Sequence, residues 1–205
     1  FSDIHAPFHD KKAIALAAKI AQWWKPNVAI WNGDNLDCYS ISKYNKSPDR
    51  TERLQDEIDS WHIEVMAPLL SALLPSPKQE PFVVDKATVL VAEEGKCTKV
   101  LLPGNHEGRL EALLWANPGL FGLRALDLPV LMELQRLGIE YARKKVLFSN
   151  ILEVSHGTKV RHQAGYIAKA ESERRRYGIS TITGHAHRAG SFMARTVNGW
   201  VKAQE

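Results

Sequence analysis

The feature that most constrains the fold is a series of short apolar runs, each of which ends at a cluster of Asp, Asn and His residues. The runs are β-branched and bounded by Gly or Pro, as buried strands are, and cover residues 1–2, 27–31, 100–102, 151–154 and 179–183. Helical patterns of apolar residues lie between them, over residues 11–24, 48–74, 109–115, 130–137 and 164–177. This alternation predicts an α/β fold with parallel strands, in which ligands bind beyond the carboxyl ends of the strands.

Two segments depart from this pattern. Pro68 lies inside the helical pattern of residues 48–74 and predicts a kink or an interruption there. We interpret residues 76–96, which contain several turn residues, as a surface insertion in which residues 82–91 could add a hairpin strand. The length of 205 residues fits one domain, 1–205. The sequence starts abruptly without a Met, and we expect the chain to be truncated at both ends, in its first strand and in its final ones.

The composition is that of a globular protein, with 44% apolar and 24% charged residues. No apolar run reaches the ~20 residues of a membrane-spanning helix, and no secretory leader is visible. The absence of such a run predicts that the protein has no membrane partner. The two cysteines are too few for a disulfide framework, so we expect a cytoplasmic protein. A net charge of +4 is compatible with an anionic partner such as DNA, RNA or a nucleotide, although many enzymes without such a partner carry a similar charge. Nothing in the sequence indicates an oligomeric state.

The polar residues at the strand ends have the chemistry of a metal centre. They are Asp3, His5, Asp34, Asp37, Asn105, His106, His156, His185 and His187. Carboxylate, imidazole and amide ligands suit divalent ions such as Mn, Fe and Zn. They are too many for one structural zinc, which takes four ligands, and fit two ions that share a carboxylate. Asp34, in a tight Gly-Asp turn at a strand end, is the natural bridge.

The order of these clusters resembles the calcineurin-like metallophosphoesterase superfamily. The motifs D-x-H, GDxxD, GNHE, HG and GHxH follow one another from residue 3 to residue 187. The resemblance implies a four-layer αββα sandwich, in which two mixed β-sheets pack face to face with helices outside. It also implies two divalent metal ions, with Mn²⁺ as the first choice and Fe, Zn or Ni as alternatives.

The resemblance further assigns roles to individual residues. It implies that Asp34 bridges the two ions, one of which is bound by Asp3, His5 and His187 and the other by Asn105, His156 and His185. His106 resembles the catalytic histidine, which donates a proton to the leaving oxygen or steadies the transition state. Glu107 would orient and polarise His106. Asp37 would support the site or fix its turn rather than bind metal.

Three residues beside the motifs are candidates for substrate binding. Arg188 directly follows the last motif and could clamp a substrate phosphate with two hydrogen bonds. Arg109 begins the helix after GNHE and could do the same, and Asn35 stands inside the GDxxD motif. For both arginines, the alternative is a structural or solvent-exposed side chain.

Together these residues predict hydrolysis of a phosphate ester by metal-bound hydroxide, with His106 as general acid and no nucleophilic side chain. The favoured substrate is nucleic acid or a nucleotide, which would make the protein a phosphodiesterase or nuclease. Two alternatives stay open. One is a phosphomonoesterase acting on a phosphoprotein or a small metabolite, and the other is a non-catalytic binding module that keeps the fold.

Overall fold

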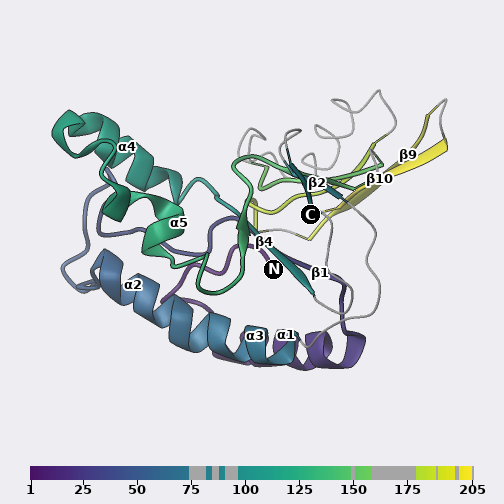
Figure 1. Ribbon diagram of the computed structural model, residues 1–205, viewed down its shortest axis with the longest axis horizontal. Coiled ribbons are helices and arrows are strands. Elements are labelled where there is room, and N and C mark those ends of the chain that lie inside the picture. The colour runs from purple at the N-terminus through teal and green to yellow at the C-terminus, as the bar shows by residue number, and fades with distance from the viewer. Residues whose placement is uncertain are drawn as a thin grey trace.

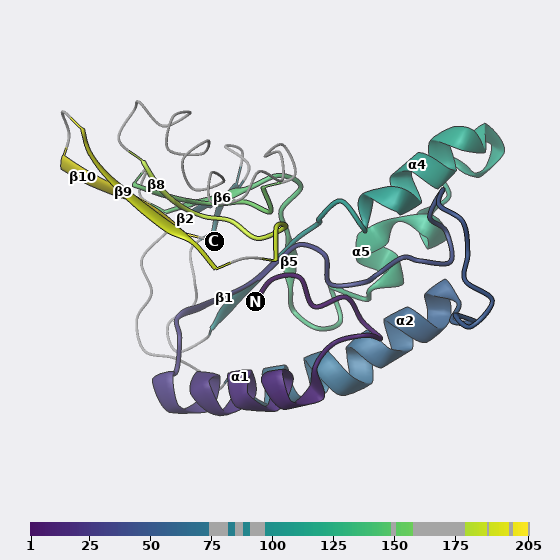
Figure 2. The ribbon, with the colours of Figure 1, turned by 180° about the vertical axis from the view of Figure 1, so that it is seen from behind.

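The protein has a mixed α/β fold with two β-sheets and several helices (Figure 1). The computed structural model describes residues 1–73, 82–84, 88–90, 97–148, 151–157, 179–187, 189–196 and 199–204. Both views place helices on one side of a small sheet and the larger sheet on its other side (Figures 1 and 2). Within the described ranges, no helix has the length and apolar character needed to cross a membrane.

The small sheet is parallel and contains β1 (Val28–Asn32), β4 (Thr98–Leu102) and β5 (Glu140–Tyr141), in that order. Its first two strands confirm the predicted runs at 27–31 and 100–102. Residues 1–6 run alongside the end of β1, where the amino group of Phe1 donates to Ile30 O at 2.9 Å. These residues do not form a regular strand, but their backbone hydrogen bonds hold the first cluster next to the second.

The larger sheet has seven described strands in the order β3-β2-β6-β7-β8-β10-β9. Their bounds are Phe82–Val84 (β2), Thr88–Leu90 (β3), Val146–Phe148 (β6), Leu152–Val154 (β7), Ser180–Ile182 (β8), Ser191–Thr196 (β9) and Gly199–Gln204 (β10). The central pair, β7 and β8, is parallel and confirms the predicted runs at 151–154 and 179–183. β2 and β3 form a hairpin within the range where the sequence predicts one, and β2 also pairs with β6, so the hairpin extends the sheet.

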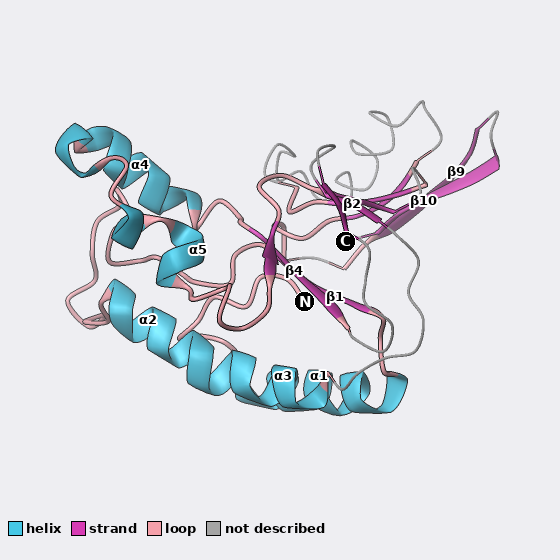
Figure 3. Cartoon of the chain, in the orientation of Figure 1, coloured by secondary structure: helices cyan, strands magenta, loops and turns pink. Residues whose placement is uncertain are grey.

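Helix α1 (Lys11–Trp24) has the predicted bounds (Figure 3). It begins there because the Asp10 carboxylate caps it, accepting hydrogen bonds from the amides of Lys12 and Ala13. It ends where Lys25 adopts a left-handed backbone before Pro26, which cannot continue a helix.

The long pattern at 48–74 forms three consecutive helical pieces: α2 (Leu54–Ser60), the π-helical η1 (Trp61–Met66) and α3 (Ala67–Ala72). Pro68 lies in the first turn of α3, directly after the π-helical segment, so the hydrogen-bond pattern changes next to the proline while the helical path continues from Leu54 to Ala72. The predicted start at residue 48 is wrong. The helix begins at Leu54 because the Asp56 carboxylate accepts the amide hydrogen of Arg53 at 2.8 Å.

The remaining described helices lie in the segment that connects β4 to β5. α4 (Gly108–Ala116) confirms the helix predicted at 109–115 and is followed by two short 3₁₀ turns, η2 (Pro118–Leu120) and η3 (Arg124–Leu126). The helix predicted at 130–137 is wrong beyond residue 131. α5 (Leu128–Leu131) ends early, and Glu133 adopts a left-handed backbone with φ of 51°. The helix predicted at 164–177 lies outside the described residues.

The small sheet is buried on both faces because its side chains alternate between two cores. Trp31 and Leu101 point toward the helices, where they share a cluster with Trp61. Val100 points the other way and shares a second cluster with Val154 of the larger sheet. The central layer therefore holds the strand ends that carry the candidate site between two packed surfaces.

Shortening Leu101 should test this arrangement. Because Leu101 is fully buried, Leu101→Ala is expected to lower the free energy of unfolding by about 2–5 kcal/mol. Leu16→Ala, on the exposed side of α1, should change it by no more than about 0.5 kcal/mol. Urea unfolding of chelator-treated protein measures both values, and similar midpoints for the two variants would contradict the assigned core.

Candidate metal centre

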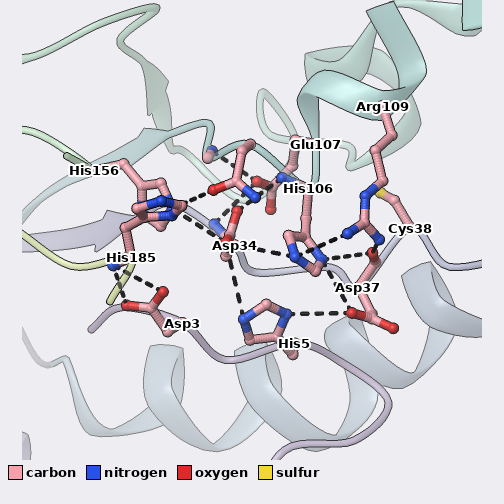
Figure 4. Close-up of polar contacts among 12 residues, drawn as sticks. Asp3, His5, Asp34, Asp37, Cys38, His106, Glu107, Arg109, His156 and His185 are labelled. Atoms are coloured by element: carbon pink, nitrogen blue, oxygen red, sulfur yellow. Dashed lines mark hydrogen bonds and ion pairs between the residues drawn. The ribbon is translucent and has the colours of Figure 1, made fainter. Parts of the chain in front are cut away.

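The clusters that follow the apolar runs converge on one site (Figure 4). They come from the carboxyl ends of β1, β4, β7 and β8 and from the segment that runs beside β1. This segment is held in place by backbone hydrogen bonds from the amide of Asp3 to Gly33 O, at 3.1 Å, and from the amide of His5 to Asp34 O, at 2.9 Å. As a result, the imidazoles of His5 and His187, which are 182 residues apart in sequence, lie 3.2 Å apart.

Among the residues that the structure describes, three overlapping groups of side chains could hold metal ions. In each group the ligand atoms lie within 4.8 Å of one another, and the groups are Asp3–His5–His187, His5–Asp34–His106 and Asp34–His156–His185. The first group matches one predicted ligand set, and the third contains most of the other. Asp34 belongs to two groups, as a bridging carboxylate would. The presence of His106 in the second group was not expected.

Asp34 lies at the centre of the site. Its Oδ2 is 3.1 Å from His156 Nε2 and 3.9 Å from the Nε2 atoms of His5 and His106. Its side chain is only 1% exposed. Burial alone would raise the pKa of this carboxyl, but the hydrogen bond and charge of His156 and the amide of His106 lower it more. Asp34 is therefore ionised at neutral pH, and one of its oxygens faces imidazoles on several sides.

His156 is held in the tautomer that a metal ligand needs. Its Nδ1 lies 2.8 Å from Asn32 O, and because a carbonyl can only accept, Nδ1 carries the hydrogen. Nε2 then faces Asp34 and also lies 3.3 Å from Asn105 Oδ1. The structure thus brings the predicted amide ligand Asn105 beside this imidazole. We did not predict from the sequence that Asn32 orients His156. The one signal for it in the sequence is that a polar residue directly follows the apolar run of β1.

The opposite end of the site is formed by Asp3, His5 and His187. His187 Nε2 lies 3.2 Å from His5 Nε2 and 3.5 Å from Asp3 Oδ1. Both oxygens of Asp3 accept the backbone N–H of His185 at 3.0 Å. The His187 side chain is 57% exposed, so this end of the site is open to solvent.

Several predicted ligands have an unusual backbone conformation. Positive φ angles, which non-glycine residues rarely adopt, occur at Asp3, His5, Asp34, His185 and His187. Each costs on the order of 1 kcal/mol or more and persists only where the surrounding structure enforces it. Such strain gathered at one place is typical of a functional site. Gly104 contributes in another way, because a Cβ atom at this position would overlap Asp34.

Glu107 does not contact His106 as we expected. Its buried carboxylate accepts four backbone N–H groups, from Asp34 at 3.0 Å, Asn35 at 2.6 Å, Leu36 at 3.0 Å and Gly104 at 2.7 Å. A buried carboxylate needs donors, and these amides supply them. Glu107 therefore fixes the turn that carries Asp34, and the predicted role of orienting His106 is wrong.

The partner of His106 is instead Asp37. Nδ1 of His106 lies 2.8 Å from Asp37 O and 3.0 Å from Asp37 Oδ1. Burial lowers the pKa of His106, but its contacts with Asp37 and the charge of Asp34 more than offset this, so the pKa is raised. Burial also opposes ionisation of Asp37, yet hydrogen bonds from His106, His5 and Arg50 hold its pKa well below the usual range. The pair joins an anionic carboxylate to an imidazole that binds a proton more readily than usual.

The structure places the three candidate substrate-binding residues differently with respect to the site. Arg109 lies beside His106, with its NH2 3.0 Å from His106 Nε2 and its NH1 donating to Asp37 O at 2.7 Å. Asn35 is fully buried and donates its backbone N–H to Glu107, so its side chain is withdrawn from the surface that substrate would reach. Arg188 lies outside the described residues.

Two further residues near the site were missed. Arg50 donates to Asp37 Oδ2 at 2.6 Å, and its guanidinium lies between the rings of Phe8 and Tyr39, 3.9 and 3.8 Å from their centroids. Glu57, on α2, is fully buried and accepts the backbone amides of Cys38 and Tyr39, in the loop that follows β1. Neither residue belongs to a motif, and both lie in residues 48–74, which we predicted to form one long helix.

Metal binding at this site should depend on pH. Burial lowers the pKa of His156, but Asp34 raises it more, so below this raised pKa a proton competes with the metal for Nε2. The affinity for Mn²⁺ is therefore expected to increase with pH and to be about tenfold or more weaker at pH 6 than at pH 8. Calorimetric titration at both pH values measures it, and equal affinities would contradict the assignment. His62→Gln, on η1, should leave the pH dependence unchanged.

Comparisons with family models, with curated proteins and with solved structures found no match for this chain. What the site can do chemically therefore rests on its own geometry. The donor set of carboxylates, imidazoles and one amide fits divalent ions of the Mn, Fe and Zn type. Two ligand groups that share Asp34 fit a pair of such ions.

Proposed function

We propose that this protein is a metal-dependent phosphoesterase of the calcineurin-like type, with two divalent ions in a four-layer αββα sandwich. The observation that carries the proposal is the position of Asp34 Oδ2, 3.1 Å from His156 Nε2 and 3.9 Å from His5 Nε2. One carboxylate oxygen thus lies between the two ligand groups. Mn²⁺ is the first choice of metal, with Fe, Zn and Ni as alternatives.

Two bound divalent ions would lower the pKa of a water molecule to near neutrality and neutralise the phosphoryl oxygens of the ester. The chain's own residues supply the remaining functions. His106 lies next to the shared carboxylate and is placed to protonate the leaving oxygen. Asp37 holds Nδ1 of His106, so that Nε2 faces the site. Arg109, which now contacts that same nitrogen, is placed to move onto a substrate oxygen.

A phosphodiester of nucleic acid or of a nucleotide is the substrate class that we favour. The net charge of +4 suits an anionic polymer, and Arg109 and Arg50 lie around His106 and Asp37. The exposed imidazole of His187 leaves one end of the site open, which a long substrate requires.

Substrate comparison tests the proposal. Protein stripped of metal and refilled with Mn²⁺ should be assayed on a nitrophenyl phosphodiester, the matching monoester, and single- and double-stranded DNA and RNA. We expect the diester to be hydrolysed faster than the monoester, because the open end of the site at His187 leaves room for a second ester group. Faster monoester hydrolysis would favour a phosphomonoesterase. No turnover with Mn, Fe, Zn or Ni would favour a binding module.

A further inference from the structure

Two buried glutamates hold the loop that follows β1 from opposite ends. Glu107 accepts the amides of residues 34–36, as described above. Glu57, which is 0% exposed, accepts the amide of Cys38 with Oε2 and the amide of Tyr39 with Oε1, the latter at 3.0 Å. Burial of a carboxylate is costly unless it binds donors, so the loop amides are the reason that Glu57 can lie inside the protein.

The amide that Glu57 binds belongs to a peptide unit that also contacts His106. The N–H of Cys38 and the C=O of Asp37 are the two polar groups of one planar, trans peptide, so they point in opposite directions. The N–H points to Glu57, and the C=O lies 2.8 Å from His106 Nδ1 and accepts from Arg109 NH1 at 2.7 Å. A side chain on α2 therefore fixes the direction of the carbonyl that contacts the imidazole.

The loop would not hold this shape by itself. Cys38 has a left-handed backbone with φ of 48°, which a non-glycine residue adopts only when its surroundings enforce it. Glu57 supplies this restraint on the backbone, while Arg50 holds the side chain of Asp37 separately through Oδ2. Ile58, the neighbour of Glu57, lies in the main core and fixes α2 in place.

We propose that Glu57 is a positioning residue for catalysis, which aims the Asp37 carbonyl at His106 by holding the peptide between Asp37 and Cys38. This inference rests on the proposed function insofar as it takes His106 as the proton donor. Among the described residues, the Glu57 carboxylate accepts hydrogen bonds from the amides of Cys38 and Tyr39, and not from the ligand groups or from His106. It therefore acts on the orientation of the imidazole and not on metal binding, whereas Glu107 acts on the turn that carries Asp34.

Glu57→Gln tests the inference with little change in volume. The amide NH₂ group cannot accept a hydrogen bond, so one of the two loop amides loses its partner. We expect kcat to fall by about tenfold or more, with KM and Mn²⁺ content unchanged. Glu64→Gln makes the same chemical change on η1, in the same helical stretch, and should leave kcat unchanged. An unchanged kcat in Glu57→Gln, or a parallel loss of Mn²⁺, would overturn the inference.

A double variant separates positioning from a general loss of structure. In a His106→Asn background, Glu57→Gln should lower kcat by no more than about twofold, because the imidazole that it positions is already absent. A loss as large as in the wild-type background would mean that Glu57 acts by another route. Such additivity would overturn the inference.

Amide hydrogen exchange reads the same contact without any turnover. Glu57→Gln should speed exchange at Cys38 and Tyr39 by about tenfold or more, while residues 34–36, which Glu107 holds, stay protected. Glu57→Asp, which keeps the charge but has a shorter reach, should show the same pattern. Unchanged protection in both variants would overturn the inference. If wild-type protein shows no turnover with any metal, the proposed function fails, and faster exchange would still show that Glu57 positions the Asp37–Cys38 peptide.

Discussion

Asp34→Asn is expected to remove bound metal and turnover together. Asp34 is shared by two of the ligand groups, and its buried carboxylate supplies negative charge between them. An asparagine keeps the shape but loses the charge. If the two ions provide about 4 kcal/mol of transition-state stabilisation, their loss lowers kcat/KM by about a thousandfold. We expect elemental analysis of the purified variant to find about one ion per chain or fewer.

Asp59→Asn is the matched control for this change, because Asp59 lies on the exposed side of α2. It should keep two ions and full activity. Retention of both ions and of turnover in Asp34→Asn would contradict the bridging role. Loss of activity with both ions retained would place Asp34 in the chemistry but not in metal binding.

His106→Asn is also expected to have a large effect, and to act on turnover alone. A positioned general acid contributes about 10²–10⁴ in rate, so kcat should fall by that factor. The loss should be largest for a poor alkyl leaving group and smallest for an activated nitrophenyl group, which leaves without protonation. Steady-state kinetics on a series of diesters measures this dependence.

Metal analysis of the same variant separates two roles that the geometry allows. His106 lies in a group that could hold a metal, with its Nε2 3.9 Å from Asp34 Oδ2. We expect the Mn²⁺ content of His106→Asn to equal that of the wild type. Loss of one ion would make His106 a ligand, and an equal loss of rate for all leaving groups would exclude it as the general acid. His62→Asn, on η1, provides the control.

The convergence of the clusters could be predicted from the sequence because it follows from the topology. The parallel strands β1 and β4 end at the same edge of one sheet, so Asp34 and Asn105 had to lie close together. The apolar run at 100–102 likewise predicted a buried strand, and Val100, Leu101 and Leu102 are all fully buried. These features depend on apolar runs and on strand direction, both of which are visible in the order of residues.

The partners of the buried glutamates could not be predicted, because they are backbone amides. Every residue except proline carries such an amide, so no residue type marks the donors to Glu107 and Glu57. The early end of α5 was missed for a related reason, since the left-handed backbone of Glu133 is set by tertiary structure and not by its side chain. Arg50 was missed because it lies in a loop that the sequence had assigned to a helix.

Anomalous diffraction from crystals soaked in Mn²⁺ tests the central claim most directly. Two manganese peaks are expected, about 3.5–4 Å apart and on either side of the Asp34 carboxylate. One peak should be next to Asp3, His5 and His187, and the other next to Asn105, His156 and His185. A soaked crystal that shows no paired peaks, with these side chains pointing away from one another, would contradict the account.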